Sequence, residues 1–232
     1  MRLKKTFWIG IVLWLVYMAC RYWLVDVCSA PYLRDFFVQD VILSFFRLAL
    51  FFAMLGLAQK ALSDEALGFR GGPLLLPVLV GGLMLAVNFI RFFRASPIQA
   101  KPIYFILELL INLLVAANEE ISFRGLFYAG LREMKNENWA LYLGSVLFTL
   151  MHWGYQPFSG FPIIFISGLI FAKLRSRGVS LTVLIVIHWL VDFLSFIYPP
   201  YGNTFPIPLF TAMLFIPLGA AFYRGAGQKT KS

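Results

Sequence analysis

Apolar residues form long stretches along this chain, and short polar or proline-containing segments separate them. A helix rises about 1.5 Å per residue, so about 20 apolar residues cross the roughly 30 Å hydrocarbon core of a bilayer. Stretches of about this size recur eight times, and the fourth ends at, or extends through, a polar motif. The expected spans are Phe7–Val25, Val41–Leu57, Leu74–Ile90, Ile103–Ala117, Trp139–Tyr155, Phe161–Leu174, Leu181–Tyr198 and Ile207–Tyr223. The pattern predicts an all-α, polytopic transmembrane helical bundle.

The composition excludes a soluble protein. Of the 232 residues, 60% are hydrophobic and 13% are charged, whereas an average soluble domain has roughly 25% charged residues. The 25 Phe, 10 Tyr and 6 Trp residues leave too little polar surface to cover a globule in water. Because the sequence has neither an internal repeat nor a long linker, we expect residues 1–232 to form a single integral membrane domain.

The basic residues indicate topology rather than nucleic-acid binding. The net charge is +9, but Lys and Arg occur in short clusters between apolar stretches and form no continuous basic stripe. Lys and Arg are in excess in cytoplasmic loops. With eight spans, both termini and every second loop share the cytoplasmic side, and most loops agree. The basic segment Arg91–Lys101 is the exception.

The first span also resembles a secretory signal peptide, since Arg2, Lys4 and Lys5 precede its apolar run. The run is longer than an ordinary signal segment and has no small-residue cleavage pattern, so we expect an uncleaved span. Cys20 and Cys28 lie eight positions apart, with no CxxC spacing and no nearby histidine. This arrangement favours neither a disulfide framework nor a zinc cluster.

Ionisable side chains within the predicted spans are the candidates for function. Each costs about 2.5–3.5 kcal/mol on insertion scales, so those that occur mark functional sites by default. The set comprises Arg47, Glu108, Glu119, Glu120, Arg124, His152, His188 and Asp192, with Asn112 and Asn118 as neutral companions. Both histidines of the chain fall within predicted spans rather than loops. Arg47 and Glu108 each stand alone at mid-span and receive no role.

Residue spacing divides the candidates by helix face. His188 and Asp192 are four positions apart and project from one face toward a common partner. Glu120 and Arg124 have the same spacing, with the acid first, so they can pair and hold the helix end in place. Glu119 is rotated about 100° from Glu120 and projects to another face. Glu119 is therefore the better candidate for a general base.

This set of side chains can hydrolyse a peptide bond, which needs a nucleophile, a base and donors for the oxyanion. Glu119 can take a proton from water with help from His152. His188 can donate to the oxyanion, while Asp192 orients it or, when protonated, donates as well. The site lies most simply in the cytoplasmic half of the bundle.

Other hydrolytic chemistries fit the sequence less well. Neither a GxSxG nor an HExxH motif occurs, and Ser122, Ser167 and Ser195 have no partner pattern for a nucleophilic serine. A zinc site made of the same Glu, His and Asp side chains is chemically allowable. We expect neither a metal nor another cofactor.

Three ordered motifs on successive hydrophobic segments resemble the CPBP family of intramembrane proteases. This family includes CAAX proteases, bacteriocin-processing (Abi) proteins and Rce1-type prenyl-protein endoproteases. The motifs are Glu119-Glu120-x-x-x-Arg124, Phe148-x-x-x-His152 and His188-x-x-x-Asp192. The resemblance covers about residues 118–192. It implies a glutamate-dependent, metal-independent protease of about eight helices with its active site within the membrane.

The resemblance also implies residue roles. Glu119 and His152 would activate the water, and His188 and Asp192 would form the oxyanion site. The supporting positions are Glu120, Arg124 and Phe148. The prenyl-protein branch usually has Asn where this chain has Asp192, and an Asp donates only when it is protonated.

The short chain looks more like a bacterial member of the family. We therefore expect an integral protein of the bacterial cytoplasmic membrane that cleaves a membrane-associated or lipidated protein or peptide. Two other functions fit the same residues. A non-catalytic bacteriocin-immunity or scaffold protein would tolerate substitution of the Glu and His residues. A proton-coupled transporter would use them as a proton relay, but the chain has no repeat-related pair of Gly/Pro-interrupted segments.

Overall fold

The computed structural model describes residues 2–27, 36–63, 67–69, 71–92, 102–153, 156–197 and 207–223, and within them every regular element is a helix. The prediction of an all-α bundle is therefore confirmed. The elements are α1 (Arg2–Val27), α2 (Phe36–Ala61), α4 (Leu75–Phe92), α5 (Pro102–Glu119), the π-helix η2 (Glu120–Phe127), α6 (Tyr128–Met134), α7 (Glu137–Leu150), the short 3-10 helix η3 (Phe158–Gly160), α8 (Phe161–Ser176), α9 (Leu181–Ile197), α10 (Ile207–Met213) and α11 (Phe215–Phe222).

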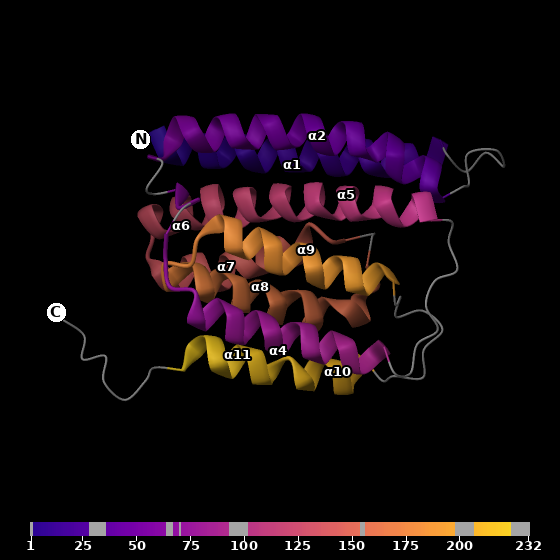
Figure 1. Cartoon of the computed structure of the whole chain (residues 1–232). Coiled ribbons are helices and arrows are strands. Elements are labelled where there is room, and N and C mark those ends of the chain that lie inside the picture. Colours follow the sequence, from indigo (N-terminus) through magenta and orange to yellow (C-terminus); the bar gives the residue numbers. More distant parts are fainter. Residues whose placement is uncertain are drawn as a thin grey trace.

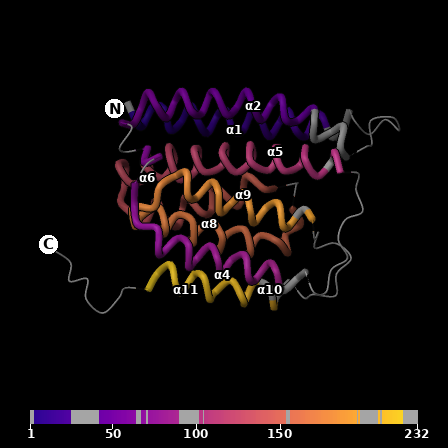
Figure 2. The backbone as a smooth tube through the Cα atoms, in the orientation of Figure 1, coloured from indigo at the N-terminus to yellow at the C-terminus, as the bar shows by residue number. Residues whose placement is uncertain are grey.

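The long helices lie side by side, and successive helices run in opposite directions (Figures 1 and 2). The α1–α2 pair packs on one side of α5, and α9 packs on the other. Next, α9 contacts α4, and α7 pairs with α8. The π-helix η2 contacts α1, α2, α7, α8 and α9. Its eight residues are all buried, so η2 lies at the centre of the bundle.

Helices that are long and apolar enough to cross a bilayer occur at three places in the described residues: Leu3–Leu24, Ile42–Ala61 and Phe158–Ser176. Shorter apolar helices occur at Leu75–Phe89, Leu181–Ser195 and Thr211–Phe222. The outer faces of the long helices expose many large apolar side chains, such as Trp23 on α1 and Phe45 on α2. Such exposure is expected for a protein whose helices face lipid. The chain is an integral membrane protein by these features, and the total of eight spans stays a prediction.

The last predicted span is broken into α10 and α11, which meet at Leu214. Pro217 lies in the first turn of α11. A proline has no N–H to donate and its ring clashes with the carbonyl four residues earlier, here that of Met213. The Leu214 N–H instead donates to the Thr211 carbonyl, a tighter 3-10-type bond of 3.2 Å. The regular helix is therefore interrupted at this point.

Two glycines allow α1 to pack closely against the continuous segment formed by η2 and α6. A Cβ atom on Gly10 would lie 2.7 Å from the Phe127 ring, and one on Gly130 would lie 2.9 Å from the Phe7 ring. Phe7 and Phe127 pack edge to face with their ring centroids 5.4 Å apart. A larger residue at either glycine would push α1 away from the centre of the bundle.

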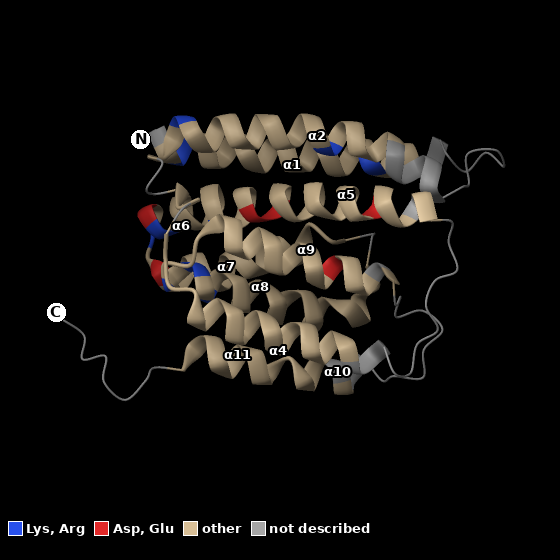
Figure 3. Cartoon of the chain, in the orientation of Figure 1, with Lys and Arg blue, Asp and Glu red and all other residues tan. Residues whose placement is uncertain are grey.

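Many of the charged residues lie at the end of the bundle where α1 begins (Figure 3). Because the helices alternate in direction, α2, α6, α8 and α11 end there as well (Figure 1). This end is the one predicted to be cytoplasmic, and the side itself stays a prediction. The exceptional Arg91–Lys101 segment lies outside the described residues except for its first two. Cys28 also lies outside them, and Cys20 is a half-buried free thiol.

We predict that Gln59, near the end of α2, and Ser159, between α7 and α8, lie on opposite sides of the membrane. Both are exposed. Each is changed to Cys in a chain whose two native cysteines are replaced by Ser. A membrane-impermeant maleimide should label Ser159→Cys in intact cells, and Gln59→Cys only after permeabilisation. Equal labelling of both in intact cells would contradict the alternating topology.

Candidate active site

The polar motif of the fourth predicted span lies inside one continuous helical segment. Instead of ending at Ala117, the helix passes from α5 into η2 and then α6, and it stops only at Met134. The fourth predicted span therefore extends through the polar motif, which is one of the two possibilities that the sequence leaves open. Glu120 and Arg124 do not hold a helix end, as the spacing suggested, because no helix ends there. A π-helical turn shifts the side-chain register within a helix and is frequent at functional sites.

Glu120 and Arg124 form the ion pair that their spacing predicted. Arg124 Nη1 lies 3.1 Å from Glu120 Oε1, and the two side chains are 2% and 0% exposed. The guanidinium also lies over the Phe148 ring, 4.2 Å from its centroid, and 5.3 Å from that of Phe171. A cation between aromatic faces is stabilised by their π electrons. The charge of Arg124 is thus matched inside the apolar bundle.

Glu120 also contacts His188 on α9, which the sequence spacing did not predict. His188 Nδ1 lies 2.7 Å from Glu120 Oε1. Because Glu120 is paired with Arg124 as a carboxylate, it accepts this bond and Nδ1 carries the hydrogen. The Nε2 atom of His188 is left to face the opposite way, where it lies 3.4 Å from Asp192 Oδ2. Glu120, rather than Asp192, therefore holds the imidazole of His188 by its Nδ1 atom.

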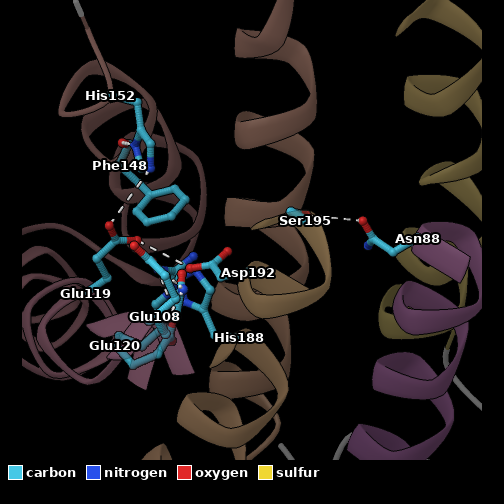
Figure 4. A network of polar contacts seen from close by, with 11 residues as sticks. Asn88, Glu108, Glu119, Glu120, Phe148, His152, His188, Asp192 and Ser195 are labelled. Atoms are coloured by element: carbon cyan, nitrogen blue, oxygen red, sulfur yellow. Dashed lines mark hydrogen bonds and ion pairs between the residues drawn. The ribbon is translucent and has the colours of Figure 1, made fainter. Parts of the chain in front are cut away.

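The carboxylate of Glu119 lies between the two histidines (Figure 4). Its Oε2 is 3.6 Å from His188 Nε2, and its Oε1 is 3.9 Å from His152 Nε2. Its side chain is 11% exposed, whereas that of Asp192 is 31% exposed. Glu119 projects away from the Glu120–Arg124 pair, as the 100° rotation between adjacent helical positions predicts.

His152 lies in a turn and not within a helix, contrary to expectation. Helix α7 ends at Leu150, and the next N–H groups form tighter bonds three residues back, such as His152 N to Thr149 O at 3.0 Å. His152 Nδ1 lies 2.8 Å from the Phe148 carbonyl oxygen, to which it donates. The turn is further tied to α1, because the Tyr22 hydroxyl donates to the Trp153 carbonyl. His152 Nε2 is thereby directed toward Glu119.

Other polar residues of the spans serve helix packing. The Asn118 amide donates to the Arg47 carbonyl at 2.8 Å and joins α5 to α2, while Arg47 Nε donates to the Tyr17 hydroxyl at 3.3 Å. The Asn112 amide donates to the Glu108 carbonyl one turn away, at 2.7 Å. These contacts join neighbouring helices or successive turns.

Ser195, one of the serines weighed as a nucleophile, is bonded outside this cluster. Ser195 donates to Asn88 on α4 at 3.4 Å, away from the histidines (Figure 4). Ser122 is fully buried in η2, and its hydroxyl has no hydrogen-bond partner in the structure. In the described part of the chain, no group of three or more His, Cys, Asp or Glu side chains is arranged to hold a metal ion.

The fold and the cluster together define a helical membrane protein with a buried carboxylate–histidine site. Comparison with protein families agrees with this class: residues 101–194 match the model for type II CAAX prenyl endopeptidase Rce1-like proteins. The matched segment contains all three motifs, so the resemblance to the CPBP and CAAX proteases is confirmed for this part of the chain. A separate comparison with curated proteins found no match. The matched proteins are endopeptidases by their description, and the match covers this segment alone.

We predict that Glu120→Gln destabilises the fold by about 3–5 kcal/mol, because it leaves the buried Arg124 charge without its partner. The free energy of unfolding in mixed micelles is the measurement. Glu133→Gln, the same change at an exposed position of α6, is the control and should stay within about 0.5 kcal/mol of the wild type. Equal stability of the two variants would show that the pair contributes little.

Proposed function

We propose that this protein is an intramembrane endopeptidase that hydrolyses a peptide bond with a water molecule activated by Glu119 and His152. The observation that carries the proposal is the position of the Glu119 carboxylate, 3.9 Å from His152 Nε2 and 3.6 Å from His188 Nε2. These three side chains come from three different segments. The family match to Rce1-like endopeptidases supports the same reaction class.

Glu119 and His152 are suited to activate water. The Nδ1 atom of His152 donates to a backbone carbonyl, so in the neutral ring Nε2 is an acceptor that can orient a water molecule. Glu119 takes a proton from this water, and the resulting hydroxide attacks the carbonyl carbon of the scissile bond. When the C–N bond breaks, the proton held by Glu119 passes to the leaving nitrogen. The cycle ends with an amine, a carboxylic acid and a site ready for another water.

His188 and Asp192 are suited to stabilise the oxyanion. Since Nδ1 of His188 donates to Glu120, Nε2 donates as well when the ring is an imidazolium. Asp192, 3.4 Å from the same Nε2, adds a second donor when it is protonated. Donors fixed in place before the reaction stabilise the developing charge.

The proposed substrate is a membrane-associated or lipidated protein or peptide, because the site lies within a helical membrane bundle. We further propose that residues 1–232 form one membrane domain in the bacterial cytoplasmic membrane, with the reactive cluster confined to residues 118–192. A bacteriocin-immunity or scaffold role is the alternative. It requires that function survive the loss of Glu119.

We predict that Glu119→Gln, His152→Ala and His188→Ala each lower cleavage by about 10²–10⁴-fold, because each removes a group that takes part in proton transfer or in oxyanion stabilisation. Mass spectrometry of membrane proteins from cells that carry each variant at matched levels is the measurement. A defined fragment should vanish in these cells and persist in cells carrying Glu133→Gln.

The same fragment should form in the presence of a metal chelator, since the proposed water activation uses only protein side chains. If Glu119→Gln cells show the same fragments as the wild type for every substrate tested, the peptidase proposal fails. Protection or partner binding that survives in that variant would then favour the immunity or scaffold function.

We predict that Asp192→Asn makes cleavage less sensitive to rising pH. A carboxyl group donates only when it is protonated, so its donor is lost as the pH rises, whereas an amide donates at every pH. The ratio of wild-type to variant activity should therefore fall as the pH rises through the titration of the Asp192 carboxyl, followed from about pH 3 to about pH 9, a range that brackets ordinary carboxyl and histidine titrations. Asp192→Ala has no donor and should be slow throughout. A constant ratio would remove Asp192 from the oxyanion site.

A further inference from the structure

Arg175 donates hydrogen bonds to backbone carbonyls in three separate segments. It lies in the last turn of α8, and its Nε donates to the Arg124 carbonyl of η2 at 3.2 Å. One Nη atom donates to Leu67, in the segment between α2 and α4, at 2.9 Å, and the other to Val179, in the α8–α9 turn, at 3.2 Å. An arginine has five N–H donors in a rigid fork, so it can serve three carbonyls at once.

The Leu67 segment is itself bonded to the start of α9. The Gly68 carbonyl accepts from the Leu181 N–H at 2.8 Å, and the Phe69 carbonyl accepts from the Thr182 hydroxyl at 2.7 Å. Gly68 has a positive φ of 62°, and a Cβ there would lie 2.4 Å from Arg175 Nη1. A glycine is therefore needed at this position for the guanidinium to reach the Leu67 carbonyl.

Arg175 thus joins the two elements that meet inside the bundle at the Glu120–His188 hydrogen bond. One is η2, which carries Glu120, and the other is α9, whose first turn is bonded to the segment that Arg175 holds. We propose that Arg175 is a positioning residue that sets the spacing between η2 and α9, and through it the contact between Glu120 and His188. The catalytic consequence rests on the proposed function, since His188 matters to hydrolysis only there.

The bond between Glu120 and His188 can be observed directly, because His152 and His188 are the only histidines of the chain. In protein labelled with ¹⁵N-histidine, the Nδ1 proton of His188 should give a strongly deshielded NMR signal that marks its bond to Glu120. The His152→Asn variant assigns the signal. This measurement needs neither a substrate nor activity.

In Arg175→Gln we expect the Nδ1 proton signal of His188 to move upfield or to vanish through exchange with water. The matched control is Arg177→Gln, because Arg177 lies two positions away and donates instead to the Phe222 and Tyr223 carbonyls at the end of α11. Its His188 signal should equal that of the wild type. A merely structural Arg175 would lower the melting temperature of the variant and leave the His188 signal of the folded protein unchanged.

Two milder changes keep the test decisive if Arg175→Gln does not fold. Arg175→Lys keeps the charge but replaces the fork by a single nitrogen, and Gly68→Ala displaces the guanidinium. Both should shift the His188 signal in the same direction as Arg175→Gln. An unchanged signal in the folded variants overturns the positioning role and leaves the peptidase proposal intact. Normal cleavage by Glu119→Gln would instead overturn the peptidase proposal and leave this inference standing.

Discussion

The packing of the helices around η2 depends on the contacts that the buried Glu120 carboxylate makes. This carboxylate is fully buried in an apolar bundle, and it pairs with Arg124 and with His188. A charge in such a place is tolerated only when its partners are fixed around it, and removing one partner is costly. The three residues come from η2 and α9, so the requirement to match this charge also fixes how these two elements pack. The aromatic rings around Arg124 complete the set.

The two adjacent glutamates have different contacts because of this constraint. Glu120 is used in the ion pair and the histidine bond, which leaves Glu119 on another face with no comparable partner and with two imidazole nitrogens within 4 Å. In the peptidase that we propose, Glu120 is structural and Glu119 reacts. His188 links the two, since one nitrogen is held by Glu120 and the other faces Glu119. The imidazole ring of His188 therefore takes part both in the buried contacts that join η2 to α9 and in the proposed reaction.

The fold class could be predicted from the sequence because lipid permits few solutions for a chain this apolar: its backbone groups must be satisfied within helices. The helices accordingly fall where the apolar stretches do. The predictions from the sequence were wrong where the predicted spans are interrupted locally. Helix α7 ends before His152, and Pro217 breaks the last span at Leu214, a break that the proline could have signalled. The apolar pattern allows the fourth span to continue through the polar motif. It does not predict that a π-helix forms there, because a π-turn has no distinct residue pattern.

The long apolar stretches predict the helical membrane bundle, and helix periodicity over a few residues predicts the Glu120–Arg124 pairing and the separate orientation of Glu119. The bond between His188 and the Glu120 carboxylate, 68 positions away, comes from how the helices pack together. The same packing brings Arg175 to the carbonyls of η2 and of the segment before α4. Spacing along one helix predicts contacts within a turn or two, whereas contacts between helices depend on packing angles and register, which many side chains set together.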